Sequence, residues 1–360
     1  MSLTPPRMLL DVRGQSASLD RVLEQQCGVG HAPLLEAAAL LRSAKRVVIV
    51  GIGASLNAAI PLENLLCAHG IESCSIEAGE FLHYRLTAYP DATIAVVSRS
   101  GESVEVAKLI AALRGRQRII GITNETASTL AREADVVLDV GSLPDEMVAI
   151  QSYTGTLLTL YLLGMAAVGE WDAGRRELDA VLAALPGWIA ANLEASRQWD
   201  AFLDGDSAVY LLGRGPSYGS AAEGALLFNE IAKAPAIGMG VASFRHGPIE
   251  VVDRHFKGLI FVPCGKTRDI NLSLAEDVHR FGGRVRLIGP QDADIAGLQW
   301  IDTPSCPDML APLLEIVPVQ VAAMRLAELR GVVVGSFRYA TQVTRDEASI
   351  ALEPPSAVNG

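Results

Sequence analysis

The sequence predicts an α/β protein made of two similar halves, each a mostly parallel sheet with helices on both faces. Three observations lead to this prediction. The length of 360 residues is enough for two domains. Short β-branched runs alternate with longer helical patterns, which is typical of parallel sheets covered by helices. Landmarks of the first half recur in the second half at a near-constant spacing, which indicates a duplication.

Seven β-branched runs are expected to form strands, four in the first half and three in the second: 46–50, 93–97, 118–122, 136–140, 208–212, 258–262 and 284–288. Between the halves, residues 155–204 are rich in Ala and Leu at helical spacing. They lack the Gly/Ser or Pro runs of a flexible linker, so two or three long helices are expected there.

Three pairs of segments carry the evidence for the duplication. The repeated pairs are 49–55 with 211–217 (offset 162), 81–83 with 244–246 (offset 163), and 97–98 with 263–264 (offset 166). The predicted organisation is an N-terminal arm (1–30), a first domain (31–170), connecting helices (171–204), a second domain (205–335) and a tail (336–360).

Composition excludes several classes of protein. The net charge is −11 and no segment is rich in Lys or Arg, so no nucleic-acid partner is expected. No apolar run reaches the 18 or so residues of a membrane span, and no signal peptide is evident. Five cysteines without a C-x-x-C pair favour a reducing, cytoplasmic location and no metal site. An acidic protein that binds an anion must therefore use local donors.

Each half begins with a strand, a G-x-G turn and a helix. A dinucleotide fingerprint needs a third small residue where this chain has Leu56 and Tyr218. No dinucleotide cofactor is therefore expected. In the first half, Ser55 stands at the predicted helix start, where its hydroxyl can cap the helix or face a bound anion. In the second half, a tight turn is the simpler interpretation.

The segment 98–103 (SRSGES) places three hydroxyls around a glycine, directly before the predicted helix 104–113. Hydroxyl and N–H donors at a helix N-terminus suit a phosphate group. The alternative is that Ser103 merely caps the helix and the rest is an ordinary turn. The second half has Cys264-Gly265-Lys266-Thr267 instead, so one phosphate site per chain is expected.

These motifs, together with a second G-R-G-x-x-Y, E-G-A-L and H-G-P, resemble the tandem SIS (sugar isomerase) family. That family includes the isomerase half of glucosamine-6-phosphate synthase and stand-alone amino-sugar-phosphate deaminases and deglycases. The resemblance runs from about residue 11 to residue 343. It implies two flavodoxin-like SIS domains joined by long helices, and a homodimer whose active sites lie at the subunit interface.

The resemblance also implies site residues. Positions expected to bind phosphate or substrate are Gly53, Ser55, Ser98, Ser100 and Ser103, while Arg99 replaces a polar residue and would add a positive charge.

In the second half, Glu230 matches the proton-shuttling glutamate of the family. His246 matches the histidine that assists ring opening, often supplied by the neighbouring subunit. Glu223 matches a structural or substrate-facing glutamate next to the dimer contact.

Four departures limit what is carried over. No glutamine-hydrolysing domain precedes Asp11, so glutamine-dependent amination is not expected. Thr341 takes the place of a lysine in the tail, and Leu227 that of a second site lysine. Residues 148–153 replace a stretch that often carries another lysine.

The residue types suit proton transfer between C1 and C2 of an open-chain sugar. A partly desolvated glutamate can take and return that proton, and histidine can assist ring opening. By spacing alone, Glu230 could be a solvated helix carboxylate and His246 a turn residue. Together with the serines they favour a phosphosugar enzyme without metal or organic cofactor. The preferred function converts glucosamine 6-phosphate to fructose 6-phosphate and ammonia. The alternatives are a fructosamine-6-phosphate deglycase and a non-catalytic phosphosugar sensor.

Overall fold

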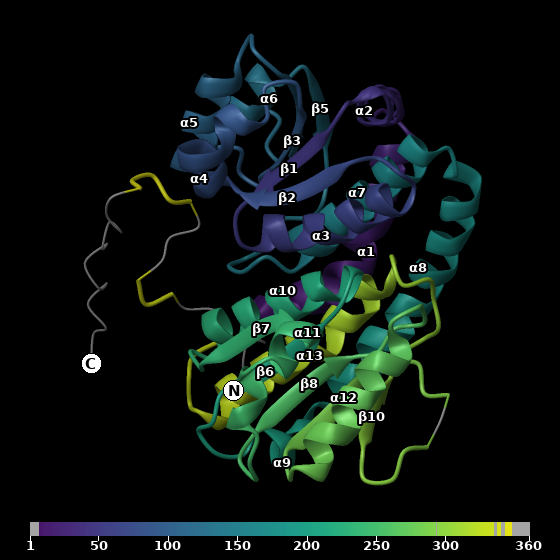
Figure 1. Ribbon diagram of the computed structural model, residues 1–360, viewed down its shortest axis with the longest axis vertical. Coiled ribbons are helices and arrows are strands. Elements are labelled where there is room, and N and C mark those ends of the chain that lie inside the picture. Colours follow the sequence, from purple (N-terminus) through teal and green to yellow (C-terminus); the bar gives the residue numbers. More distant parts are fainter. Residues whose placement is uncertain (1–6, 293, 335–336, 340–342, 348–360) are drawn as a thin grey trace, which may run out of the picture.

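The computed structural model describes residues 7–292, 294–334, 337–339 and 343–347. The described chain forms two α/β units, one above the other in Figure 1, with the long helix α8 along one side of both. Two helices, α3 and α10, lie between the two sheets where the units meet. The fold class predicted from the sequence is therefore confirmed.

The upper unit in Figure 1 holds the first half of the chain. Its elements are α1 (Arg7–Cys27), α2 (His31–Ser43), β1 (Val47–Gly51), α3 (Ala54–Ala68), β2 (Ser73–Glu77), α4 (Ala78–Glu80), η1 (Phe81–Arg85), η2 (Leu86–Ala88), β3 (Thr93–Val97), α5 (Val104–Leu113), β4 (Arg118–Thr123), α6 (Thr129–Glu133), β5 (Val136–Asp139) and α7 (Gln151–Val168).

A helical connection of α8 (Trp171–Glu194), η3 (Ser196–Trp199) and α9 (Asp200–Leu203) leads to the lower unit. The elements of the lower unit are β6 (Val209–Gly213), α10 (Pro216–Ile231), β7 (Ala236–Gly240), α11 (Val241–Arg245), η4 (Pro248–Val251), β8 (Lys257–Phe261), α12 (Arg268–Arg280), β9 (Arg284–Gly289), β10 (Gln299–Asp302) and α13 (Ala311–Leu329).

The two sheets share one topology. The first has the strand order β2-β1-β3-β4-β5 and the second β10-β9-β8-β6-β7, with every pairing parallel. Both orders reduce to 2-1-3-4-5, the flavodoxin-like order, in which the chain changes direction along the sheet between its first and third strands. The duplication inferred from the sequence is thus present in the fold.

Strand registers correct one of the three repeat offsets. Val47 pairs with Thr93 in the first sheet and Val209 with Lys257 in the second. These pairs set the first strands 162 residues apart and the third strands 164 apart. The offset of 166 expected from the sequence is therefore wrong at this landmark. The correct counterpart of residues 97–98 is 261–262, which makes Thr267 the counterpart of Ser103.

Three strands were missed in the sequence: β2, β7 and β10. All three lie at sheet edges. Most residues of β2 and β7 are only partly buried, and β10 has a single buried residue, Ile301. Edge strands with glycines or polar residues do not produce the continuous apolar run that identifies a central strand.

The predicted helical connection is present, and it begins earlier than expected. Helix α7 starts at Gln151 and is buried along almost its whole length, so it has no polar face. Helix α1 packs against both α7 and α8. Among the described helices, none combines the length and hydropathy that crossing a bilayer would require.

Helices α3 and α10 follow corresponding strands and pack directly against each other. At their crossing, a Cβ on Gly219 would lie 2.6 Å from the backbone oxygen of Asn57, so only glycine permits this approach. Residues 57 and 219 occupy equivalent positions at the offset of 162. Equivalent positions that touch each other indicate a two-fold relation between the halves.

Candidate active site

A cavity of about 280 Å³ lies at the carboxyl ends of β1 and β3. These neighbouring strands flank the point where the chain reverses its direction along the sheet, which is where ligands bind in folds of this type. The lining residues come from the β1–α3 turn, the β3–α5 loop, α5, α7 with its preceding loop, α10 and the tail: Ile52, Gly53, Ala54, Ser55, Val97, Ser98, Arg99, Ser100, Ser103, Glu105, Val106, Met147, Val148, Ala149, Ser152, Tyr153, Thr156, Leu226, Glu230, Phe337, Val343 and Thr344.

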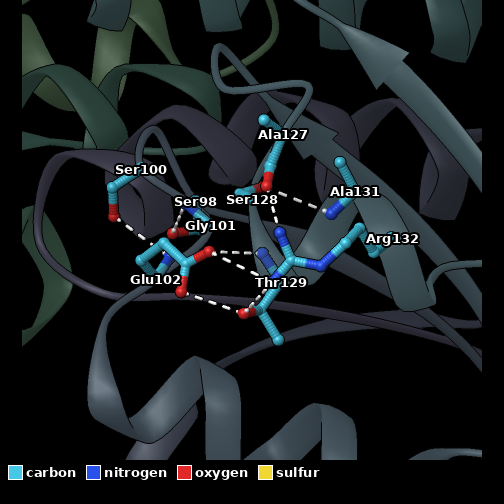
Figure 2. Close-up of polar contacts among 9 residues, drawn as sticks. All are labelled: Ser98, Ser100, Gly101, Glu102, Ala127, Ser128, Thr129, Ala131 and Arg132. Carbon is cyan, nitrogen blue, oxygen red and sulfur yellow. Dashed lines mark hydrogen bonds and ion pairs between the residues drawn. The ribbon is translucent and has the colours of Figure 1, made fainter.

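The serine loop, residues 98–103, is held by its own hydrogen bonds (Figure 2). Ser98 Oγ accepts from Gly101 N at 3.1 Å, and Ser100 Oγ accepts from Glu102 N at 3.3 Å. Accepting fixes each oxygen but leaves the hydroxyl proton to be donated elsewhere. Both serines line the cavity, so their protons can be donated to a bound anion.

Glu102 is not among the residues that line the cavity, and its carboxylate ties the loop to the start of α6 (Figure 2). Its Oε1 accepts from Thr129 N at 2.5 Å and its Oε2 from Thr129 Oγ1 at 2.9 Å. Gly101 has a φ of 60°, and a Cβ there would lie 2.2 Å from Ser128 Oγ. The glycine and the glutamate of the motif therefore shape the loop, and the serines face the ligand space.

Ser103 occupies the N-cap position of α5, yet its side chain makes no capping hydrogen bond. The simple capping alternative therefore does not describe this serine, and its hydroxyl lines the cavity. Ser55 lies in the first turn of α3 and also lines the cavity. Gly53, directly before α3, has φ 53° and ψ −128°, a conformation that favours glycine.

Glu230, from the second half, reaches the same cavity from the last turn of α10. It is half-buried. Burial raises the pKa of its carboxyl above the ordinary value, and the positive charges of Lys233 and Arg99 oppose that rise. A glutamate carboxyl is a group that can take up a proton and return it, as general acid–base catalysis requires.

The N-terminus of α7 and the loop before it also line the cavity. Asp145 accepts from the backbone N–H groups of Gln151 (2.6 Å) and Ser152 (3.1 Å), which fixes the first turn of the helix. Burial raises the pKa of Asp145, and these hydrogen bonds oppose the rise. Ser152 and Tyr153 then line the cavity, so the wall expected to lack a lysine carries two hydroxyl-bearing residues, and the Ser152 hydroxyl donates to Asp145.

The tail crosses from the second unit to the first. Phe337 and Thr344 line the cavity, and Val104 N donates to Thr344 O at 3.0 Å at the start of α5. Glu347 bonds Lys108 and, at 2.5 Å, His83. Thr341 lies outside the described residues.

Two predicted site residues do not line the cavity. Glu223 is fully buried between α10 and α3, where its Oε2 accepts from Asn57 Nδ2 at 2.9 Å. Burial raises its pKa to about 8. His246 is exposed at the C-cap of α11. The roles expected for these two residues stay predictions.

Leu227, expected at the place of a site lysine, is buried in the core, and Leu226 faces the cavity in its place. The sequence indicates the segment 148–153, which contains the cavity residue Tyr153, as a wall of the site. It does not indicate the cavity residue Phe337 or the nearby Lys233. A phenylalanine in the tail, or a lysine just after a helix, has no sequence signal that distinguishes it from an ordinary surface residue.

At the corresponding edge of the second sheet, the serines are bonded to a buried carboxyl. Ser217, the counterpart of Ser55, donates to Glu315 Oε1 at 2.7 Å, and Ser220 donates to Oε2 at 2.6 Å. All three side chains are buried. Burial raises the pKa of Glu315 to about 7, and the serine hydrogen bonds oppose the rise. Ser55 of the first unit thus lines a cavity, whereas its counterpart in the second unit is bonded to a buried carboxyl.

Comparison with known proteins agrees with this architecture. Residues 40–168 and 203–329 each match the SIS domain family, one match per unit. The chain belongs to the SIS domain family. The family resemblance predicted from the sequence is therefore confirmed. The two matches correspond to the two units of the duplication, and each contains one complete parallel sheet.

Relatives and solved structures extend the comparison. The SIS protein is 29% identical over 335 residues to a glutamine–fructose-6-phosphate aminotransferase of Pyrobaculum aerophilum, covering 91% of this chain and 55% of the relative. It therefore spans about half of that relative. The C-terminal domain of the Francisella tularensis glucosamine-fructose-6-phosphate aminotransferase superposes with a TM-score of 0.82 at 20% identity, covering 92% of this chain and 98% of that one.

A glucosamine-6-phosphate deaminase of Thermotoga maritima superposes with a TM-score of 0.74 at 21% identity, covering 94% of this chain and 100% of that one. At this identity the likeness shows the fold. Within the described residues, no group of three His, Cys, Asp or Glu side chains is arranged to hold a metal ion.

Proposed function

We propose that this SIS protein is a phosphosugar isomerase that deaminates glucosamine 6-phosphate to fructose 6-phosphate. One observation carries the proposal: the serine loop of the first unit and Glu230 of the second line the same cavity. The loop supplies neutral donors for a phosphate, and the glutamate supplies a base at the other end of the ligand. The relatives named above are sugar-phosphate proteins of both amination and deamination, which supports the substrate class.

In the proposed reaction, the open-chain sugar loses its C2 proton to Glu230, which gives an enolamine. Glu230 then returns a proton to C1, while the amino nitrogen loses a proton and the former aldehyde oxygen gains one to become a hydroxyl. The product is the imine at C2 of fructose 6-phosphate. Water adds to that imine and ammonia leaves, so one water is consumed and one ammonia is released per sugar. His246, supplied by a neighbouring subunit, would assist the initial ring opening.

The test is a direct assay of ammonia and ketose. Incubation with glucosamine 6-phosphate should release ammonia and fructose 6-phosphate in a ratio of one to one. In deuterated water, the ketose should carry label at C1. Unphosphorylated glucosamine should react far more slowly because the serine loop then has no ligand. Equal turnover of the two sugars would contradict the phosphate role of the loop.

A deglycase acting on a 6-phosphorylated fructose–amine adduct is the second candidate. The observation that favours it is an apolar flank of the cavity, formed by Met147, Leu226 and Phe337, which ammonia as a leaving group would not contact. Faster release of an amino acid from such an adduct than of ammonia from glucosamine 6-phosphate would establish this candidate instead. Binding of phosphosugars without turnover of any would identify a sensor.

The proposed dimer has its own test. If Glu230 of one chain works with His246 of its partner, mixing inactive Glu230→Gln with inactive His246→Asn subunits should restore part of the activity. One of the two sites in a mixed dimer then carries no lesion. The size of the assembly is measured by light scattering, and subunit exchange by mass labelling. No recovery under proven exchange would mean that both residues act within one chain.

A further inference from the structure

Lys233 has a backbone conformation that its residue type disfavours. Among the described residues it is the one non-glycine with a positive φ, at 51°. It follows directly on the end of α10, at a place where proteins usually have glycine because a Cβ is disfavoured there. A lysine at such a position suggests that its side chain is used.

The Lys233 side chain is held at two points beside the cavity. Its Nζ donates to the backbone oxygen of Glu230, which places the ammonium group at the negative end of the α10 dipole. The same Nζ lies 5.7 Å from the centroid of the Phe337 ring, and Phe337 lines the cavity. The ammonium group therefore joins the end of α10 to the tail.

Several charged groups surround the Glu230 carboxyl. Arg99 reaches it from the serine loop and Lys233 from the end of α10, and both positive charges lower its pKa. Glu223, two turns earlier on α10, and Glu105 on α5 are the acidic groups nearby, and Glu105 lines the cavity.

Beyond these, burial lowers the pKa of Lys233, and the charge of Arg338 in the tail lowers it further. Burial raises the pKa of Asp145 before α7, and the charge of Arg99 is among the groups that oppose this rise. Of the positive groups named here, Lys233 is the one that lies on the same segment as Glu230, at the end of α10.

We propose that Lys233 is a positioning residue for Glu230, supplying the positive charge that accompanies this carboxylate and fixing the tail beside it. The inference rests on the proposed role of Glu230 as the base. Leu227, where the family pattern has a lysine, is buried in the core and supplies no charge. Lys233 stands one turn beyond Glu230 and Leu227 one turn before it, so the positive charge has moved to the other side of the carboxylate.

The experiment compares Lys233→Gly with the wild type. Glycine relieves the disfavoured backbone conformation, so the variant should fold at least as stably, as measured by its Tm. Without the ammonium charge, Glu230 should need a higher pH to ionise. We expect the acid limb of the kcat/KM profile to move up by about one pH unit. Lys233→Asn, another neutral residue that tolerates this conformation, should give the same shift, and Lys233→Arg should restore the wild-type profile.

Phe337→Leu is the matched control for the tail contact. It removes the ring but keeps the cation, so it should leave the midpoint of the acid limb in place, whatever it does to KM. An unchanged acid limb in Lys233→Gly would overturn the proposal. So would an acid limb that moves as far in Phe337→Leu as in Lys233→Gly, because the tail and not the charge would then be responsible.

A second measurement does not depend on turnover. The Glu230 carboxyl is titrated by carbon-13 NMR in protein labelled at the glutamate carboxyls, and its signal is assigned by its loss in Glu230→Gln. The midpoint should be higher in Lys233→Gly than in the wild type. If no phosphosugar is turned over, the proposed function fails, and this titration still decides the role of Lys233. Equal midpoints in the two proteins would refute it.

Discussion

At the start of α3, the Ser55 side chain lines a cavity, whereas at the start of α10 its counterpart Ser217 donates to Glu315 Oε1 at 2.7 Å. The next loops differ in the same way. The serine loop faces the cavity, while at the counterpart loop a Cβ on Gly265 would lie 2.8 Å from Asp308 Oδ2. One topology thus holds an open donor site in one copy and a packed polar core in the other.

The turn itself is common to both copies, so the site depends on which side chains the packed helices bring to the sheet edge. In the second unit, α13 brings Glu315 against Ser217 and Ser220. In the first unit, α10 brings Glu230 to the cavity, and the serines of the loop also line it. Four predictions test this difference, beginning with the largest expected effect.

The first prediction concerns the contribution of the second unit to the site. Glu230→Gln keeps the size of the side chain but cannot carry a proton between carbons. We expect kcat to fall by about 10²- to 10⁴-fold, with ligand affinity nearly unchanged because the serine loop supplies most of it. Steady-state kinetics and calorimetric binding of a phosphosugar measure the two effects. Turnover at the wild-type rate would mean that another base acts.

The second prediction concerns the internal carboxyls. Burial raises the pKa of Glu315 to about 7 and that of Glu223 to about 8, from an ordinary value of 4.5. As pH rises from 4.5 to 7, the unfolded chain releases protons that the folded protein keeps. The free energy of unfolding should therefore fall over this interval, by about 2–3 kcal/mol per group.

Urea denaturation at pH 5 and pH 7.5 measures this loss. Glu315→Gln should show a smaller loss than the wild type, because the amide does not titrate. A variant that loses as much stability as the wild type over the same interval would show that Glu315 is ionised in the folded protein. The second unit would then hold a fixed anion at this edge, and the contrast with the first unit would be one of charge as well as packing.

The third prediction concerns the loop hydroxyls. Ser100→Ala and Ser103→Ala should each weaken phosphosugar binding by about 1–3 kcal/mol, the cost of an unpaired acceptor. The matched controls are Cys264→Ala and Thr267→Ala, at the corresponding positions of the second unit. Isothermal titration should find no change for these controls. A loss of affinity in the second-unit variants would reveal a ligand at that edge too.

The fourth prediction, with the smallest expected effect, concerns the two G-x-G turns and separates their effect on stability from their effect on ligand binding. Gly53 and Gly215 share one conformation, with φ of 53° and 54°, and an added Cβ at either has room. Gly53→Ala and Gly215→Ala should each lower the free energy of unfolding by at least about 1 kcal/mol. Only Gly53→Ala should also change ligand affinity, because only Gly53 lines the cavity. Equal effects on binding would contradict the comparison.

The sequence predicted the fold well because central strands and duplicated motifs leave clear patterns. The prediction missed edge strands such as β7, whose Ala-Ile-Gly-Met-Gly sequence has low strand propensity. In the site, the serines and Glu230 line one cavity as a family motif would suggest. Contacts between segments far apart in the sequence could not be predicted. Phe337 and Leu226 lie in the cavity because of how the tail and α10 pack.

Lys233 shows a second limit of the sequence. Its spacing from Glu230 is that of any lysine near a helix end, and its importance is visible only in its positive φ and its contact with Phe337. Glu223 shows a third limit. The family motif predicts a structural or substrate-facing glutamate there, and the sequence does not choose between the two roles. Packing of α3 against α10 places the side chain outside the cavity, paired with Asn57.

The close approach of Asn57 and Gly219 has a consequence for how one site can exist in a molecule with two equal halves. A half-length chain with this fold would present the same helix to a second copy of itself, and any change in that helix would occur on both sides of the contact. Joining the copies in one polypeptide removes that constraint. Helix α10 can carry Glu230 while α3 carries Ala68 at the equivalent position. The tandem chain can therefore hold a single pocket with a base, where a symmetric pair would hold two or none.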